Sequence, residues 1–262
     1  MKLIWLSDLH FQAEGDVLGH DPRVRLNAAV AYINAHHGDA ELCVISGDMV
    51  NRGTTKDYSA LADALEALSV PYAPLAGNHD DRALLSKHLP LPDERLPGFI
   101  QYAVPTSEAL IVCLDTHKPG SDAGEICEDR LAWLHDLLET HSGPPVLLFM
   151  HHHPMPLGLP MQDTENLLNG SDLLDLIEQT GGVTQMCIGH IHRPIIGTVR
   201  GIPFATMRSV LYQAPAPQPD WDWDDFAPAE EAPNMGVVTI QNGDVVIHYH
   251  QFCAYAAGVS AA

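Results

Sequence analysis

The chain has 262 residues, of which 34 are acidic and only 13 basic, so its formal net charge at pH 7 is −21. Such a surface repels polyanions, and we expect neither nucleic acid nor an anionic membrane as a partner. Five cysteines occur without a C-x-x-C pair, and no apolar stretch is long enough to cross a bilayer. We therefore expect a globular protein of the reducing cytoplasm that is neither exported nor anchored.

Short apolar runs alternate with helical patterns through most of the chain. The run LIWLS at 3–7 is followed by a helix that opens at Asp21 and Pro22, and then by ELCVIS at 41–46. The alternation continues with four further apolar runs and three further helical patterns, the runs being PYAPLAG at 71–77, ALIVCLD at 109–115, PVLLFM at 145–150 and TQMCIG at 184–189. This order predicts an α/β fold in which helices cover the faces of the sheets.

After residue 194 the pattern changes to strands and turns. Arg200-Gly201 and Asn242-Gly243 each separate two apolar runs, which predicts a C-terminal region of antiparallel hairpins. Between them, at about 213–235, lies a loop rich in proline and acid that carries Trp221, Trp223 and Phe226. Its aromatic residues could cover a site or form a subunit contact, or the loop could simply be solvated. We expect one domain over 1–262, and the sequence leaves open whether it forms a homo-oligomer.

Side chains that can bind metals follow five of the predicted strands. In open α/β sheets, ligands gather outside the carboxyl ends of the strands, so segments far apart in sequence can converge there. In D-x-H and H-x-H, residues i and i+2 of an extended segment point the same way and can serve one centre. The five segments are Asp8-Leu9-His10, Gly47-Asp48, Gly77-Asn78-His79-Asp80, His151-His152-His153 and Gly189-His190-Ile191-His192.

The donor set consists of oxygen and imidazole nitrogen, without thiolates. It suits Zn, Mn, Fe or Co and argues against a structural zinc site or an iron–sulfur cluster. Seven candidate ligands exceed what one such ion holds, so we expect two ions with Asp48 as the bridging residue. We expect the glycines before Asp48, Asn78 and His190 to let the backbone turn sharply beneath the site.

These segments, read as DLH, GD, GNHD, a histidine after an apolar strand and GHIH, resemble the signature of the calcineurin-like metallophosphoesterase superfamily over residues 3–192. The likeness is greatest to bacterial glycerophosphodiesterases and class III cyclic nucleotide phosphodiesterases, whose members often continue from the strand histidine into a second histidine and P-x-P, as in HHHPMP at 151–156. The resemblance implies a four-layer α/β/β/α sandwich with two mixed β-sheets that holds a dinuclear metal centre.

The resemblance also implies how the candidate ligands are divided between two divalent or mixed-valence ions. It assigns Asp8, His10, Asp48 and His192 to one ion, and Asp48, Asn78, His151 and His190 to the other. It further implies that His79 lies beside the leaving group. There His79 would supply a proton, and Asp80 is the candidate carboxylate that orients it.

The sequence suggests three substrate contacts. GDMVNRG at 47–53 resembles the Ser/Thr phosphatase form of its block, in which the arginine contacts phosphate, so Arg52 is either such a contact or a surface residue. Arg82, just after GNHD, is a further candidate, and His153 could face either substrate or solvent. If the segment stays extended, His152 points to the other side and packs or orients its neighbours.

Together these features predict a phosphodiesterase for a small phosphodiester, either a glycerophosphodiester or a 3′,5′-cyclic nucleotide. Metal ions lower the pKa of bound water to about 7, which supplies hydroxide for in-line attack on phosphorus. Neutral Asn78 helps to keep the pocket positive, since a third carboxylate would reduce its charge. The alternatives are a phosphomonoesterase or a phospholipase-C-like phosphohydrolase, and, more remotely, a non-catalytic scaffold with this fold.

Overall fold

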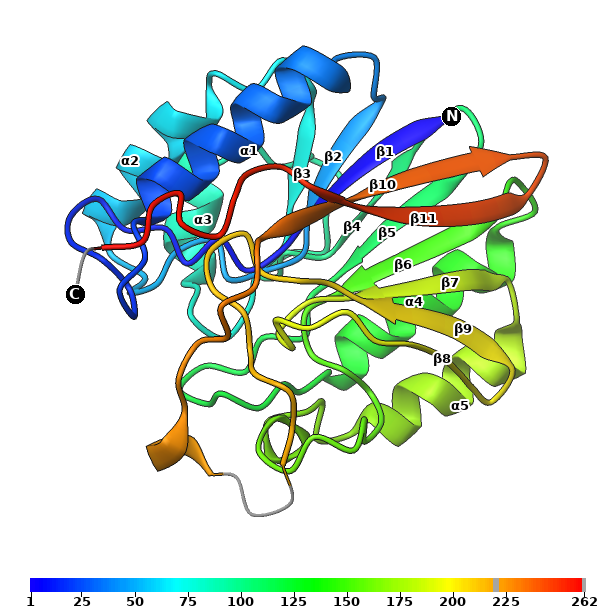
Figure 1. Ribbon diagram of the computed structural model, residues 1–262. Coiled ribbons are helices and arrows are strands. Elements are labelled where there is room, and N and C mark those ends of the chain that lie inside the picture. The colour runs from blue at the N-terminus through cyan, green and yellow to red at the C-terminus, as the bar shows by residue number, and fades with distance from the viewer. Residues whose placement is uncertain (219–221, 261–262) are drawn as a thin grey trace.

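The computed structural model describes residues 1–218 and 222–260, and it contains two mixed β-sheets packed between helices (Figure 1). The first sheet has five strands in the order β11-β10-β1-β2-β3. Its strands are β1 (Lys2–Leu6), β2 (Leu42–Ile45), β3 (Tyr72–Pro74), β10 (Asn234–Gln241) and β11 (Asp244–Gln251). β1, β2 and β3 are parallel, whereas β10 pairs antiparallel with both β1 and β11.

The second sheet has six strands in the order β4-β5-β6-β7-β9-β8. Its four central strands are parallel, and the edge strands β4 and β8 are antiparallel to their neighbours. The strands are β4 (Tyr102–Pro105), β5 (Leu110–Leu114), β6 (Val146–Met150), β7 (Val183–Ile188), β8 (Ile196–Val199) and β9 (Ile202–Thr206).

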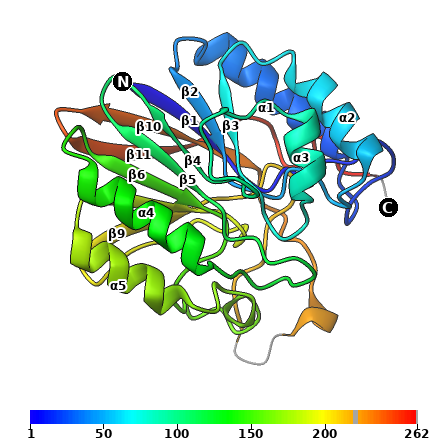
Figure 2. The ribbon, with the colours of Figure 1, turned by 180° about the vertical axis from the view of Figure 1, so that it is seen from behind.

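Helices cover the outer faces of both sheets. α1 (Pro22–His36), α2 (Thr55–Leu65) and α3 (Arg82–His88) lie on the side of the five-stranded sheet, and α4 (Glu128–Thr140) and α5 (Gly170–Thr180) cover the six-stranded sheet (Figure 2). As predicted, Asp21 caps α1, because its side chain accepts hydrogen bonds from the backbone N–H groups of Arg23 and Val24. The predicted four-layer sandwich is confirmed.

The inner faces of the two sheets share one apolar core. The Trp5 ring of β1 meets the Phe149 ring of β6 edge to face, with the ring centroids 5.8 Å apart. Trp5 Nε1 also donates a hydrogen bond of 2.8 Å to Ser46 Oγ. A second core, which includes Leu134, Leu148 and Leu173, joins the six-stranded sheet to α4 and α5. These cores hold the strand ends, and therefore the loops beyond them, in fixed positions.

Both predicted hairpins are confirmed. Arg200-Gly201 connects β8 to β9 and Asn242-Gly243 connects β10 to β11, and all four residues have positive φ, at 48°, 82°, 53° and 88°. Positive φ at both central residues is the requirement of a type I′ turn, and its twist matches that of the paired strands.

One α-helix and one strand were not predicted from the sequence. α3 has only seven residues with Leu85 as its one buried residue, and β4 is an edge strand that ends in Pro105, so neither has a strong periodic signal. The aromatic loop contains a short 3₁₀ turn (Trp223–Asp225) and ends where β10 begins at Asn234, slightly earlier than predicted. Trp221 lies outside the described residues. Within the described part of the chain, no helix combines the length and apolar character that a bilayer requires.

Candidate functional site

The five predicted segments meet where β1, β2, β3, β6 and β7 end. Backbone hydrogen bonds join the first two segments, from Asp8 N to Gly47 O (3.1 Å) and from His10 N to Asp48 O (2.9 Å). The buried carboxylates of Asp8 and Asp48 connect two further segments to these. His190 N donates to Asp8 Oδ1 and His79 N donates to Asp48 Oδ1, each at 3.0 Å. Residues 182 positions apart in the sequence, Asp8 and His190, therefore meet at one centre.

One group of candidate ligands consists of four buried residues whose ligand atoms all lie within 4.8 Å of one another, namely Asp8, His10, Asp48 and His192. His10 Nε2 lies 3.0 Å from His192 Nε2. His10 Nε2 lies 3.4 Å from Asp48 Oδ2, and His192 Nε2 lies 3.4 Å from Asp8 Oδ1. Such separations are those of atoms that surround an ion at about 2.1 Å each, so this group fits a first-row metal.

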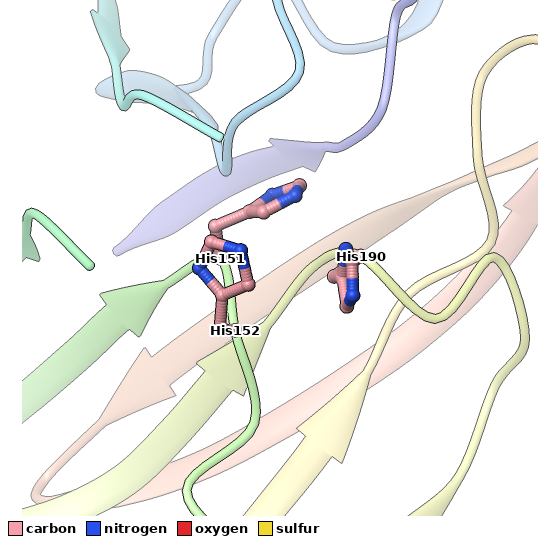
Figure 3. Close-up of side chains that lie close together, drawn as sticks. All are labelled: His151, His152 and His190. Carbon is pink, nitrogen blue, oxygen red and sulfur yellow. The ribbon is translucent and has the colours of Figure 1, made fainter. Parts of the chain in front are cut away.

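A second group lies next to the first and contains His151, His152 and His190 (Figure 3). Asn78 Oδ1 and Asp48 Oδ1 approach it, at 3.1 Å and 3.5 Å from His151 Nε2. Asp48 thus directs Oδ2 toward the first group and Oδ1 toward the second. This geometry suits a bridging carboxylate.

His152 differs from its neighbour in its hydrogen bonds. Its Nδ1 lies 2.8 Å from Thr116 Oγ1, and its Nε2 lies 3.1 Å from the Asp122 carbonyl oxygen. The rings of His151 and His152 are only 4.9 Å apart, because the chain bends at these residues instead of staying extended. The condition under which His152 would point to the other side is therefore not met, and His152 is a packed histidine with both ring nitrogens engaged.

The backbone is strained at most of the candidate ligands. Five of them are non-glycine residues with positive φ, namely Asp8 (54°), His10 (40°), Asp48 (49°), His190 (67°) and His192 (52°). Left-handed backbone of this kind costs on the order of 1 kcal/mol or more per residue and persists only where the surrounding fold enforces it. Its concentration at one centre is typical of a functional site.

Two glycines lie directly against the candidate ligands. A Cβ atom at Gly47 would lie 2.3 Å from His151 Nδ1, and one at Gly77 would lie 2.2 Å from Asp48 Oδ1. Gly47 also has φ of +98°, as a sharp turn requires. The chain turns directly after Gly77, as predicted, because Asp80 N donates to Gly77 O at 3.3 Å, and this turn does not need positive φ at Gly77. The missing side chain of Gly77 also lets the backbone approach the ligands closely.

Protein carbonyl groups orient two of the imidazoles. His192 Nδ1 donates to Tyr212 O and His151 Nδ1 donates to Ser46 O, both at 2.9 Å. Because a carbonyl oxygen only accepts, the proton resides on Nδ1 and leaves Nε2 of each ring available as a ligand.

The ionisation of the site favours metal binding at most candidate ligands, with His151 as the exception. Burial lowers the pKa of His151, but the Asp48 and Asp8 carboxylates outweigh burial and raise it to about 9, so a metal would have to displace this proton. Burial alone would raise the pKa of Asp48, but the neighbouring imidazoles of His151, His79 and His10 outweigh burial and hold this pKa well below its usual range. Burial lowers the pKa of His10 to about 3 and also lowers that of His190 well below its ordinary value. Ionised carboxylates and neutral imidazoles are the forms that ligate metals.

Two buried atoms test whether the site fits metal ions. Asp8 Oδ2 and His190 Nε2 have no hydrogen-bond partner within the described residues. Most buried polar atoms in proteins are paired, and an unpaired one costs about 1–3 kcal/mol. Cations at this centre would satisfy both atoms, so the residues present fit a metal centre.

His79 lies beside this centre. Its Nδ1 donates to the backbone carbonyl of Asn51 at 2.9 Å, and its ring meets the His10 ring edge to face at 4.7 Å. This orientation leaves Nε2 as the ring atom available for a reactant. Burial lowers the pKa of His79, but the Asp48 charge outweighs this effect and raises it.

Asp80 does not orient His79, and this prediction is wrong. Its carboxylate accepts hydrogen bonds from four other groups, which are the Met49, Val50 and Gly77 backbone N–H groups (3.0, 3.3 and 2.9 Å) and the Tyr58 hydroxyl (2.7 Å). It therefore joins the loops after β2 and β3 that carry Asp48 and Asn78. The backbone carbonyl of Asn51 orients His79 instead. A backbone contact of this kind cannot be recognised from the amino-acid sequence.

Two of the predicted substrate contacts are also wrong. Arg82 forms a bidentate ion pair with buried Asp115, through bonds of 2.6 and 2.8 Å, and also donates to His117 O. His153 is fully buried, with Nε2 3.3 Å from Asp163 Oδ1. Arg52 lies exposed after β2, outside the residues that line the cavity described next.

The candidate ligands open into a cavity of about 380 Å³. Besides candidate ligands and His79, its lining consists of Asp122, Gln162, Glu165, Ile191, Tyr212, Ala214, Trp223 and Phe226. Trp223 and Phe226 come from the aromatic loop, so this loop covers the site. Sequence reasoning missed Asp122, Gln162 and Glu165, which lie in loops without a recognisable motif. Burial and the Asp122 charge raise the pKa of Glu165 to about 7.

Comparisons with known proteins agree with this geometry. Residues 1–194 match the family model described as calcineurin-like phosphoesterase. The chain is 37% identical over 257 residues to a probable cyclic nucleotide phosphodiesterase of Rhodopseudomonas palustris, covering 96% of this chain and 93% of that protein. It is 28% identical over 264 residues to a glycerophosphodiester phosphodiesterase of Enterobacter lignolyticus, covering 98% and 93%. A dimetal phosphatase from Danio rerio has the same fold, with a TM-score of 0.71 at 15% identity and coverage of 97% and 96%.

Proposed function

The chain belongs to the calcineurin-like phosphoesterase family as a metal-dependent hydrolase of phosphoric diesters, and we propose that its substrate is a small phosphodiester. Two classes fit, glycerophosphodiesters and 3′,5′-cyclic nucleotides, for which the two relatives are named. The observation that carries the proposal is Asp48, whose two oxygens lie 3.4 Å from His10 Nε2 and 3.5 Å from His151 Nε2. This carboxylate joins two ligand groups beside one cavity.

We assign the ligands of two ions, for which Fe, Mn, Zn and Co are all suitable. Asp8, His10, Asp48 and His192 would hold one ion, and Asp48, Asn78, His151 and His190 would hold the other. His152 is left out because both of its ring nitrogens have protein partners. The neutral side chain of Asn78 limits the negative charge of the centre.

When bound, such ions would act as Lewis acids that lower the pKa of a water molecule to about 7 and offset charge on the phosphoryl oxygens. His79 would supply the proton that the leaving alkoxide needs. Its Nδ1 is fixed on the Asn51 carbonyl, so Nε2 is the atom that delivers this proton. Asp80 supports the reaction indirectly, because its hydrogen bonds hold the loops of Asp48 and Asn78 in place.

The cavity supports a small substrate. Its volume of about 380 Å³ is of the size that binds small molecules, and none of the described residues that line it is lysine or arginine. The net charge of −21 would also repel a polyanion. These features favour a single diester group over a nucleic acid.

The test is turnover by Mn-reconstituted protein on bis(p-nitrophenyl) phosphate, p-nitrophenyl phosphate, glycerophosphocholine and cyclic AMP. We expect Mn-dependent activity that prefers the diester of the p-nitrophenyl pair and collapses in Asn78→Ala. Gln179→Ala, which removes an exposed amide from α5, is the control and should retain full activity. A preference for p-nitrophenyl phosphate would move the assignment to a monoesterase, and inactivity with metal bound would favour a scaffold.

A further inference from the structure

We propose that three histidines on the outer face of the five-stranded sheet bind a transition-metal ion at a site separate from the candidate metal centre. The outer imidazole cluster consists of His37, directly after α1, and of His248 and His250 in β11. Zn²⁺, Cu²⁺ and Ni²⁺ are the ions that suit a site made of imidazole nitrogen. The inference is independent of the proposed function.

The strand β11 directs both of its histidines to one face. Tyr249 lies between them and points toward the six-stranded sheet, because its hydroxyl donates to Thr206 O at 2.9 Å. Successive side chains of a strand point to opposite faces, so His248 and His250 point to the outer face of the five-stranded sheet. β11 forms the edge of this sheet (Figure 1). The H-x-H spacing in this strand therefore offers two imidazoles to one ion.

His37 supplies the indication that a ligand belongs here. The residue is only 8% exposed, and neither of its ring nitrogens has a hydrogen-bond partner among the described residues. Buried polar atoms in proteins are normally paired, and a neutral imidazole has one donor and one acceptor nitrogen. A metal ion would bind the acceptor nitrogen, which no described protein group satisfies.

The ring separations agree with binding to a shared ion. An imidazole that binds an ion at 2.0–2.1 Å places its ring centre about 3.2 Å from the ion, so two rings on a tetrahedral ion have centres about 5 Å apart. The ring centres of His37 and His250 are 5.5 Å apart, and those of His248 and His250 are 6.1 Å apart. His37 and His250 therefore lie close to a ligating separation. His248 has to rotate toward them, which its exposed position permits.

The charges around the cluster allow a cation to bind. Burial and the Lys2 ammonium lower the pKa of His37, so its imidazole is neutral at pH 7, and the neutral form is the one that ligates metals. Lys2 by itself would repel a metal ion, but its ammonium group forms an ion pair with Asp39. The net charge of −21 further favours the approach of cations.

A metal ion at this cluster would join the end of α1 to the edge strand β11. An ion that binds only the folded protein stabilises it by mass action. We therefore expect Zn²⁺ to raise the midpoint of thermal unfolding more in the wild type than in His250→Gln. An equal rise in both proteins would contradict this cross-link.

Equilibrium dialysis of the Mn-reconstituted protein against Zn²⁺ counts the additional ion. Mn²⁺ is the weakest binder of its series, so it should occupy the candidate metal centre and leave the outer imidazole cluster empty. We expect total Mn plus Zn, measured by mass spectrometry, to be one equivalent higher in the wild type than in His37→Gln or His250→Gln. Because loss of an outer-shell partner already costs about 10- to 100-fold in metal affinity, loss of a ligand should weaken Zn²⁺ binding at least about tenfold.

Two controls make the count specific. His135→Gln removes an exposed imidazole from α4 and should retain the additional equivalent. Turnover of bis(p-nitrophenyl) phosphate should be the same in the wild type, His37→Gln and His250→Gln, because these residues lie outside the candidate metal centre. The two variants alter different elements, so His250→Gln keeps the test valid if His37→Gln does not fold.

Three results would overturn the proposal. Equal metal content in the wild type and both cluster variants would show that the histidines bind no ion. An equal loss in His135→Gln would show that Zn²⁺ binds surface histidines without preference. Loss of both Zn²⁺ and turnover in the two cluster variants would show that the ion counted belongs to the candidate metal centre. If no protein turned over the diester but the additional equivalent still depended on His37 and His250, the proposed function would fail while the outer site stood.

Discussion

The backbone of Gly77 lies against the carboxylate of Asp48 so closely that a Cβ atom at position 77 would fall 2.2 Å from Asp48 Oδ1. The same atom would lie 2.7 Å from His151 Cε1, so a side chain here would displace residues of both ligand groups. The size of residue 77 is therefore part of the site, although the residue has no functional group.

Gly77→Ala should reduce metal binding while leaving the protein folded. Asp48 contributes to both ligand groups, so its displacement should lower the bound metal from about two equivalents to one or fewer. Metal content after reconstitution, measured by mass spectrometry, checks this expectation. Gly38→Ala is the control, because a Cβ atom there would make only ordinary contacts of 3.4 Å or more. Full metal content in Gly77→Ala would show that Asp48 does not bridge.

Asp80→Asn should destabilise the fold more than an ordinary polar substitution. Each carboxylate oxygen accepts two buried hydrogen bonds, so the new amide NH₂ would face two donors that it cannot pair. We expect the free energy of unfolding of the metal-free protein to fall by about 2–5 kcal/mol. Denaturant titration checks the value, with Asp63→Asn on the exposed face of α2 as the control. A change no larger than that of the control would contradict the anchoring role.

His79→Gln should slow the reaction without removing metal. Loss of a proton donor costs about 10²- to 10⁴-fold in kcat, and the effect depends on how much the leaving group needs a proton. We therefore expect a large loss on glycerophosphocholine and a small loss on bis(p-nitrophenyl) phosphate, because p-nitrophenolate leaves without help. Metal analysis and kcat on both substrates provide the check. Equal losses on the two substrates would refute proton donation by His79.

Asp163 makes the stability depend on pH in the acid range. Burial would raise its pKa, but hydrogen bonds from His153 and from the backbone N–H groups of Leu157 and Leu159 outweigh burial and lower it. Because the pKa of Asp163 is lower in the folded than in the unfolded protein, the ionised carboxylate stabilises the fold at pH values above the pKa of the unfolded state, which is near 4. This stabilisation disappears as the pH falls through the lower pKa of the folded state.

Asp163→Asn should therefore lower the free energy of unfolding by about 1–2 kcal/mol at neutral pH. The difference from the wild type should stay constant above pH 5 and shrink below pH 4. Unfolding titrations across pH 3–7 measure it, with exposed Asp93→Asn as the control. If the stability difference between wild type and variant grew toward acid pH, the pKa of Asp163 would be raised in the folded state and not lowered, which would contradict our inference.

The sequence by itself determined the features that depend on local chemistry. Asp21 and Pro22 indicate the start of α1. Asn242 and Gly243 predict a hairpin because both residue types tolerate positive φ. The alternation of apolar runs and helical patterns predicted the layered architecture. Strand ends rich in aspartate and histidine also identified the edge of the sheets at which the candidate ligands meet.

Only the tertiary structure decided which partner each polar side chain meets. Asp80, Arg82 and His153 were predicted for the site from their positions in the sequence, yet buried hydrogen bonds and ion pairs engage them elsewhere. Asp122 and Glu165 carry no motif and still line the cavity, because the loops after β5 and β6 fold toward the metal centre. Such pairings join residues distant in sequence, and their energies depend on burial and distance, which exist only once the sheets have packed together.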